Sequence, residues 1–454
     1  MKSIFLTLCI ISCLNWPAYA ATINAASCNL PAIQTAYNSA TRVVDTILVP
    51  PGNCTWTGIL TLSKGVILQG SGAGVTNITA SQSSPVILIS PDATMYQNNE
   101  RLEIFGFTLS NTINAGGGDI SIIKASSNTS SVASNIVIHD NVLNAFSGVT
   151  GSVTAQGFNI QGGIYGVAYH NTFNGIYFIK TTGATTSGYD DWNAFSYIPG
   201  SFKSFVLEDN TWNVRSFPYN EGGQGGGAYT LRYNDINFTN ATENGDLFDV
   251  HGPQGAGGGQ GIEFYGNHIF NNNTWDNNGV HRGGRGKVFF NKNTGSSQAI
   301  YEVQELHPTD IGFPAEKVVQ SYYWNNYDNT TRVNVSCFSG NGCTFITENT
   351  DYFNQNPSYN GTTQRGIFVG ASLPAACTTL DGAWITSQTI GSAMTGMTGR
   401  DPSTPLSGTL YRCNGGVWQV FYTPYTYPHP LRGVIVPDTM PPAAPTNLRF
   451  AQKE

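Results

Sequence analysis

Seven segments of the chain share one pattern, a short stretch of alternating apolar residues that closes on asparagine. The asparagines are Asn141, Asn171, Asn210, Asn234, Asn267, Asn293 and Asn326, and subtraction gives separations of 30, 39, 24, 33, 26 and 33 residues. The shorter separations suit one solenoid coil of three short strands, and the longer ones suit the same coil with an added loop. The repeat therefore predicts an all-β fold, a parallel β-helix.

The period of each segment predicts which side chains face the interior. The residues three before each asparagine are nearly all apolar and are expected to point inward: Ile138, Ala168, Leu207, Leu231, Phe264, Phe290 and Tyr323. The residues two before it are expected to point outward: His139, Tyr169, Glu208, Arg232, Tyr265, Asn291 and Trp324. Each asparagine would lie at a tight bend and bond the asparagine of the next coil, about 4.8 Å away.

The first twenty residues have the pattern of a secretory signal. A charge at Lys2 precedes an apolar run, and Ala18 and Ala20 supply the small residues of a cleavage site. We expect residues 1–20 to be a signal peptide, and we expect a secreted or cell-surface protein of bacterial type. As an alternative, the residues up to Cys13 resemble a lipobox, which would leave a lipid on that cysteine. No later segment is long and apolar enough to predict a membrane span.

The remainder divides into a β-helix domain over 21–436 and a Pro-rich tail or linker over 437–454. The tail resembles the linker and first strand of a fibronectin type III module. Within the domain, residues 337–421 are predicted to be terminal coils and a cap that protects the last sheet edges.

Six cysteines remain after the signal peptide, an even number that predicts disulfides in an exported chain. Proximity in the sequence suggests Cys28 with Cys54, Cys337 with Cys343, and Cys377 with Cys413. Zinc is the weaker interpretation, because no paired C-x-x-C spacing occurs. The net charge of −7 argues against nucleic acid as the main ligand, since that binding depends on neutralising phosphates. We expect a monomer.

Both ends of the domain carry a resemblance. Residues 31–79 start with an amphipathic stretch, Pro31 to Tyr37, expected to form a capping helix, and continue through ILVPPGNCTWTG to LTLSKGVILQGSGAGVTNIT. This resembles the opening of pectate-lyase-like right-handed β-helices. Residues 422–431, YTPYTYPHPL, resemble the ending of many secreted bacterial β-helix proteins of an uncharacterised subgroup. The resemblance covers roughly residues 28–436 and implies a right-handed parallel β-helix with a short N-terminal capping helix and disulfide-containing C-terminal coils.

The same resemblance does not imply a reaction, because the superfamily includes lyases, hydrolases, isomerases and binding proteins. The pectate lyase signatures W-I-D-H and R-x-P-x-x-R are missing. Polygalacturonases carry N-T-D, D-D and G-H-G in that order, whereas here Asn349 to Asp351 follows Asp190 and Asp191, and G-H-G is absent. Catalytic residues are therefore not carried over from either family.

Histidine, arginine and carboxylates concentrate in one region, beside the long insertions at 174–201, 213–228 and 252–261. Insertions of a solenoid usually build a groove on one face. The candidate catalytic residues are His251, His281, Arg282 and Arg285; the candidate substrate-binding residues are Trp192, Tyr219, Tyr265 and Glu302; the candidate ligands of a Ca²⁺ ion are Asp249 and Glu305. A purely structural role for His251, His281 and Arg282 stays open.

These residues suit a polysaccharide lyase that acts on an acidic glycan. Such an enzyme needs a cation or an arginine to neutralise the uronate carboxylate, and a base to take the neighbouring ring proton. Aromatic side chains can stack on the sugar faces. The alternative hypothesis is a noncatalytic extracellular protein, a glycan-binding protein, adhesin or stalk; a glycoside hydrolase fits less well.

Overall fold

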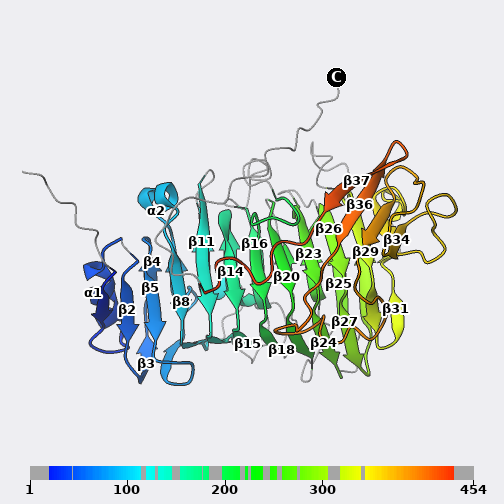
Figure 1. The fold of residues 1–454 in the computed structure, drawn as a ribbon. Coiled ribbons are helices and arrows are strands. Elements are labelled where there is room, and N and C mark those ends of the chain that lie inside the picture. Colours follow the sequence, from blue (N-terminus) through cyan, green and yellow to red (C-terminus); the bar gives the residue numbers. More distant parts are fainter. Residues whose placement is uncertain are drawn as a thin grey trace, which may run out of the picture.

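The computed structural model describes residues 20–42, 44–113, 119–127, 131–145, 154–175, 177–183, 197–214, 220–222, 226–238, 246–252, 258–272, 277–304, 317–338 and 343–433. Three long sheets wind around one axis as a right-handed parallel β-helix (Figure 1), which confirms the predicted fold class. Almost all of the predicted signal peptide and the whole tail over 437–454 lie outside the described residues. In the described part of the chain, no helix has the length and apolar character needed to cross a bilayer.

Each coil contributes one strand to each of three sheets, named here A, B and C in the order in which the chain passes through them. Sheet A contains β1 (Thr22–Asn24), β2 (Thr46–Val49), β5 (Ile67–Gly70), β8 (Leu102–Phe105), β11 (Val132–His139), β14 (Gly163–Tyr169), β17 (Phe205–Glu208), β20 (Ala228–Arg232), β23 (Gly261–Tyr265), β26 (Arg285–Phe289), β29 (Ser321–Trp324) and β33 (Tyr352–Asn354).

Sheet B contains β3 (Gly52–Trp56), β6 (Thr76–Ala80), β9 (Thr108–Asn111), β12 (Val142–Asn144), β15 (Thr172–Gly175), β18 (Thr211–Val214), β21 (Asp235–Phe238), β24 (His268–Asn271), β27 (Lys292–Gly295), β30 (Asn326–Asp328) and β31 (Thr331–Val333). Sheet C contains β4 (Leu60–Leu62), β7 (Ile87–Ile89), β10 (Asp119–Ser126), β13 (Thr154–Gln161), β16 (Tyr177–Thr182), β19 (Asn220–Gly222), β22 (Asp246–Val250), β25 (Asn277–His281), β28 (Ala299–Val303) and β32 (Ser336–Cys337).

An asparagine ladder runs along the bend between sheets A and B. Its members are Asn141, Asn171, Asn210, Asn234, Asn267, Asn291 and Asn326, and each Nδ2 donates to the Oδ1 of the next at 2.9 to 3.1 Å. The residue before each one has a left-handed backbone; for example, φ is 55° at Asp209. This tight bend presents the asparagine amide to both neighbouring coils, as the sequence predicted for six of the seven positions.

The prediction of Asn293 as a ladder residue is wrong, because Asn291 occupies that rung. Asn293 instead faces the interior from β27, and its Nδ2 donates to the carbonyl of Ser297 at 2.9 Å. The two asparagines are two residues apart, so a period of two cannot distinguish them. In this coil Val288 therefore points inward and the ring of Phe289 points outward, where it stacks on Tyr265 and Trp324.

The N-terminal end of the stack is covered by α1 (Leu30–Ser39), as predicted. Pro31 lies in the first turn, a position that its missing N–H suits, and Ile33, Ala36 and Tyr37 are buried against the first coil. A second helix, α2 (Ala93–Asn98), lies between sheets C and A. All three predicted disulfides are present: Cys28–Cys54, Cys337–Cys343 and Cys377–Cys413.

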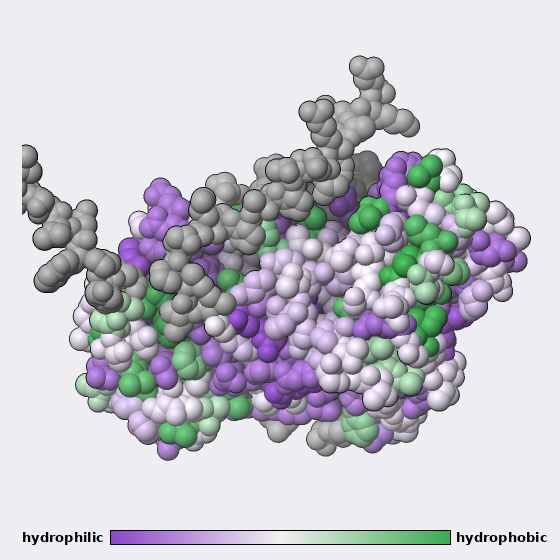
Figure 2. Space-filling view, viewed as in Figure 1, coloured by the Kyte–Doolittle hydropathy of each residue, from purple (hydrophilic) through white to green (hydrophobic). Residues whose placement is uncertain are grey.

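The C-terminal region covers a side of the β-helix and does not merely close its end. A fourth sheet, D, consists of β34 (Ile367–Gly370), β35 (Gly382–Ile385), β36 (Thr409–Asn414) and β37 (Val417–Tyr422). Its side chains Trp384, Leu410 and Tyr422 form one apolar cluster with Phe289 and Trp324 on the outer face of sheet A. Figure 2 shows hydrophobic residues gathered at the sheet D end of this side, where Val417 and Val420 of β37 are exposed.

After β37 the chain runs back across the outer face of sheet A, the red segment in Figure 1. We call residues 423–432 the strap. The fully buried Arg232 donates to the carbonyls of Tyr425 and Thr426 in the strap, and the backbone N–H of His429 donates to Glu208 at 2.9 Å. The strap therefore replaces solvent over a polar face of the sheet.

Candidate functional site

The outer face of sheet C carries a register column of polar residues. Neighbouring strands align Lys124, Asn159, Lys180, Glu221, Asp249, Val280 and Glu302. The adjacent residues Ile123, Phe158 and Ile179 belong to the interior cluster, so Lys124, Asn159 and Lys180 point away from it. We call this series the outer column of sheet C, and it contains two of the residues predicted for the site, Asp249 and Glu302.

Asp249 is the centre of a compact ionic cluster at the end of β22. Its Oδ1 accepts from Nε of Arg282 at 3.0 Å, and its Oδ2 accepts from Nη2 of the same guanidinium. Nε2 of His251 lies 2.8 Å from Oδ2. The side chain of Asp249 is 6% exposed, whereas those of Arg282 and His251 are 16% and 20% exposed. The cluster thus has a buried carboxylate with two partly accessible cationic or basic groups above it.

The fold brings these three residues together from two coils. Val250 pairs with His281 in the parallel register of β22 and β25, so the residues that follow each strand, His251 and Arg282, leave the sheet at adjacent bends. Burial alone would raise the pKa of Asp249, but the hydrogen bond from His251 and the charge of Arg282 outweigh it and hold that pKa below its usual value. Asp249 is therefore an anion at neutral pH and orients both partners.

Glu302 lies in the same column, two strands beyond Asp249. Val280 lies between them in register, and this apolar residue separates the two carboxylates. The side chain of Glu302 is half-buried, and burial raises its pKa. Glu302 therefore lies on the same face of sheet C as the ionic cluster without being part of it.

His281 does not reach this face. It points into the β-helix with no exposed surface, where Nδ1 lies 2.5 Å from the hydroxyl of Tyr323 and Nε2 lies 2.7 Å from the carbonyl of Gly283. Burial lowers its pKa to about 4, so it is neutral. His281 aligns with the inward residues Val250 and Val303, so the prediction of His281 as a residue of the site is wrong.

Two other predicted site residues belong to the outer face of sheet A. Tyr265 is fully buried beneath the C-terminal region, and its hydroxyl accepts from Nη1 of Arg232 at 2.9 Å. It cannot contact a sugar in this structure. Arg285 lies at the start of β26, where burial and the neighbouring Arg412 of sheet D lower its pKa. The predicted grouping of Arg285 with Arg282 is therefore not observed.

Trp192, Tyr219 and Glu305 lie outside the described residues. The predicted ligand Asp249 has no free carboxylate oxygen to offer a calcium ion, because its two oxygens already bind Arg282 and His251. A calcium site needs six to eight oxygen ligands, and a guanidinium would have to leave before Asp249 could offer any.

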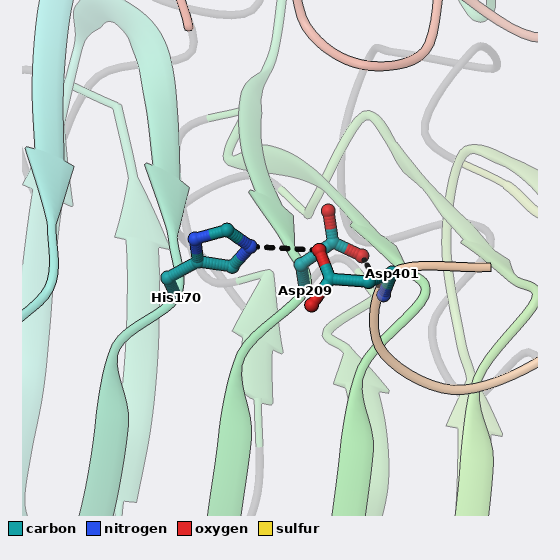
Figure 3. A group of neighbouring side chains, drawn as sticks. All are labelled: His170, Asp209 and Asp401. Atoms are coloured by element: carbon teal, nitrogen blue, oxygen red, sulfur yellow. Dashed lines mark hydrogen bonds and ion pairs between the residues drawn. The ribbon is translucent and has the colours of Figure 1, made fainter. Parts of the chain in front are cut away.

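A second ionic cluster, which the sequence did not reveal, lies where the strap ends. Figure 3 shows His170 and Asp209, from successive bends of the β-helix, directed toward Asp401 of the C-terminal region. Nε2 of His170 lies 2.8 Å from Asp401, and the backbone N–H of Asp401 donates to Asp209. Their ligand atoms lie within 4.8 Å of one another, close enough for a metal ion.

Arg432 already supplies the positive charge in that cluster. Its guanidinium bonds Asp209 and Glu208 and lies 3.2 Å from Nε2 of His170. Tyr427 donates to both oxygens of Asp209, which are then fully used. We therefore assign this cluster to fastening the strap and not to metal binding.

Comparisons with known proteins show no family for this chain. No known family and no curated protein matches the chain. Among solved structures, it is similar to ORF18 of Geobacillus virus E2, with 14% identity, a TM-score of 0.30, and coverage of 63% of each chain. It is also similar to an alginate lyase from Paenibacillus sp. str. FPU-7, with 13% identity, a TM-score of 0.31, and coverage of 63% of this chain and 98% of that one. Likenesses this distant carry no argument about the reaction, so the parallel β-helix stands on the sheets themselves.

Proposed function

We propose that the protein is an exported carbohydrate-active protein that cleaves an acidic glycan as a lyase, with the glycan lying along the outer column of sheet C. The observation that carries the proposal is the cluster of Asp249, His251 and Arg282. It combines a histidine held by a carboxylate with an arginine on a partly accessible face.

The chemistry assigned to this cluster is β-elimination. A base removes the proton from the ring carbon next to the uronate carboxylate, and the electron pair of that C–H bond forms a carbon–carbon double bond. The bond to the glycosidic oxygen breaks at the same time, and this oxygen leaves with the electron pair and takes a proton from water. Asp249 bonds Nε2 of His251 and fixes the orientation of its ring, and we assign the imidazole of His251 as the base. The guanidinium of Arg282 would neutralise the uronate carboxylate, whose charge grows as the proton leaves.

Export has support of its own. Three disulfides suit an oxidising compartment, since such bonds are rare in reducing ones. With the signal peptide proposed over residues 1–20, they favour an extracellular polysaccharide as partner.

A noncatalytic glycan-binding role is the second candidate. The observation that favours it is the mutual neutralisation within the cluster, because Arg282 uses two of its three nitrogens on Asp249. A closed ion pair of this kind can orient a bound sugar without taking part in chemistry.

The test is to incubate the mature chain, from Ala21, with a panel of uronate polysaccharides, with and without calcium, and to follow the ultraviolet absorbance of the unsaturated product. We expect His251→Ala and Arg282→Lys to reduce the rate at least about 100-fold, the usual size of a lost general base or charge stabiliser. His268→Ala is the matched control, because His268 also pairs with an aspartate, Asp235, but on the outer face of sheet B.

Folding of each variant is checked by circular dichroism. No product from any polysaccharide, together with retention on a uronate column, would favour the binding protein. A product that survives His251→Ala in a folded variant would remove His251 from the mechanism.

A further inference from the structure

A pocket of about 430 Å³ lies at the C-terminal end of the β-helix, where β31 reverses direction against β30 and β33 ends sheet A. Every residue that lines it, except Pro357, carries an amide, a carboxylate or a guanidinium. The volume falls within the range of about 300–1,000 Å³ that is usual for ligand sites, but those sites are mostly apolar. The pocket therefore suits a small ligand that is rich in polar groups.

Arg332 gives this pocket a positive charge that no protein group neutralises. In the part of the chain that the structure describes, its half-buried guanidinium makes no hydrogen bond or ion pair, although Glu348 lines the same pocket. A guanidinium that is partly withdrawn from water gains most from an anion that accepts its hydrogen bonds. Arg332 is therefore free to bind a carboxylate that enters the pocket.

Gln355 gives the pocket a fixed hydrogen-bond donor. The residue is 8% exposed, and its Oε1 accepts from the backbone N–H of Asn325 at 2.8 Å, which holds the amide in one orientation. Its Nε2 has no hydrogen-bond partner among the described residues, and this atom is not sealed from solvent. Native structures leave few donors of buried side chains unused. A ligand in the pocket can reach this one.

Two further polar groups are held in place by buried neighbours. Nε of Arg365 donates to both oxygens of the fully buried Asp381 at 2.8 Å, and Nη2 donates to two backbone carbonyls at 3.1 Å. Nδ2 of the buried Asn354 donates to Oε1 of Glu348 at 2.9 Å. Nη1 of Arg365 and Oε2 of Glu348 have no partner within the described ranges. The pocket therefore offers an oriented donor and an oriented acceptor, which lowers the cost of ordering on binding.

We propose that this pocket binds a uronate sugar, either free or at the end of a glycan. The carboxylate pairs with Arg332, and the hydroxyls, which both donate and accept, bond to Gln355, Arg365 and Glu348. Two guanidinium groups disfavour a metal cation in the same space. The carboxylate of Glu348 disfavours a compact dianion such as phosphate.

The pocket is separate from the ionic cluster on sheet C. Glu302 lies two strands beyond Asp249, and it pairs with Ser336 of β32 one strand further along. Three strand spacings are about 14 Å. Asn334 of the pocket precedes Ser336 by two residues. A sugar in the pocket thus leaves the ionic cluster unoccupied, so this inference goes beyond the proposed function and does not depend on it.

The test is a calorimetric titration of the mature chain with galacturonate, galactose and inorganic phosphate. We expect galacturonate to bind at least about 10-fold more tightly than galactose, because a charge-assisted hydrogen bond is stronger than a neutral one. Arg332→Met should abolish this preference and leave the midpoint of thermal unfolding unchanged, because Arg332 has no bond to lose in the described structure. Gln355→Glu keeps the oxygen that Asn325 needs and should weaken galacturonate more than galactose.

Two variants are the controls. Arg282→Lys alters the ionic cluster, and Arg400→Met removes a charge of the C-terminal region that bonds Thr211 of sheet B. We expect both to keep the preference for galacturonate. A preference that survives Arg332→Met and disappears in Arg282→Lys would assign the sugar to the ionic cluster and overturn the pocket. Equal affinity for galacturonate and galactose, or equally tight binding of phosphate, would also overturn it.

The single sugar has no glycosidic bond to cleave, so this titration reads binding whether or not the protein is a lyase. A galacturonate tetramer distinguishes the two sources of the ligand. It is added in a His251→Ala background, which prevents cleavage. Displacement of bound galacturonate by the tetramer identifies the end of a glycan as the occupant, and failure to displace it identifies the free sugar.

Discussion

His139 shows how a single outward residue can be held as a cation on the β-helix. Its ring stacks between Phe105 and Tyr169, with centroids 4.6 and 4.7 Å away. Nε2 lies 2.8 Å from Glu103 and Nδ1 lies 2.6 Å from Asp140. Burial alone would lower the pKa of His139, but the bonds to the two carboxylates prevail and raise it above its usual value.

A pH dependence follows from this shift. Because the folded state holds the proton more tightly than the unfolded state, the stabilisation is complete below the unfolded pKa, about 6.5, and is lost as the pH rises through the higher folded value. We expect the wild type to lose stability relative to His139→Phe, which cannot titrate, as the pH rises above about 6.5. Urea unfolding of both proteins below and above that pH measures the difference, and parallel curves would contradict the prediction.

The direction of a side chain could be predicted from the sequence where the strand period alone determines it. The ladder asparagines and the inward Ile138 and Leu207 follow from period two and a tight bend. The rule gave a wrong result at Asn293, where two asparagines share the same parity, and at His281, where a polar residue faces the interior because Tyr323 and Gly283 bond it there. The hydrogen-bond partners that decide these two cases cannot be identified from the sequence around Asn293 or His281.

At the scale of elements, the strap is the feature least visible in the sequence. Glu208, Arg232 and Tyr265 point outward from the β-helix, as the period of two predicts. In the structure all three are buried, because the chain returns about 200 residues later to cover them. The candidate site was only partly predictable. The concentration of charged residues near Asp249 is visible in the sequence. Whether each of these side chains points outward or inward, and from which sheet, depends on the exact positions of the bends.

The strap is predicted to depend on Arg432. This residue bonds both Glu208 and Asp209, whose side chains are fully buried. Arg432→Met leaves two buried carboxylates with one less partner, and breaking a buried pair in this way costs about 3–5 kcal/mol. We expect faster amide hydrogen exchange in β17 and β20, while β4 and β7 of sheet C stay protected.

Arg400→Met is the comparison for that experiment. Arg400 also joins the C-terminal region to sheet B, through the hydroxyl of Thr211, but its side chain is 33% exposed. We expect Arg400→Met to lower the free energy of unfolding by less than about 1 kcal/mol. Equal exchange in the two variants would show that Arg432 does not fasten the strap.

At the scale of the whole molecule, the asparagine ladder couples successive coils in addition to their strand pairing and core packing. Asn210 receives bonds from the side chain and the backbone N–H of Asn171, and donates to Asn234. Asn210→Ala removes these bonds and leaves buried polar groups without partners in both neighbouring coils. We therefore expect the free energy of unfolding to fall by about 2–4 kcal/mol, with a single cooperative unfolding transition.

A second ladder on the outer face of sheet B provides the control. Asn213 bonds Asn174 at 2.8 Å in the same geometry, but it is partly exposed, so water can replace its partners. We expect Asn213→Ala to change the free energy of unfolding by less than about 1 kcal/mol. A similar loss for both variants would mean that burial does not decide the strength of a ladder.

The strap also determines when folding of the chain can be completed. Arg101 donates to the carbonyl of Leu431, 330 residues further along the chain. A coil made early during synthesis must therefore wait, with its outer face uncovered, until Leu431 has been made. Contacts that span so much of a chain form late and slowly. A chain that terminates before Tyr422 would lack part of sheet D and the whole strap. Its β-helix would expose the apolar surface around Phe289 and Trp324, which could associate with other chains.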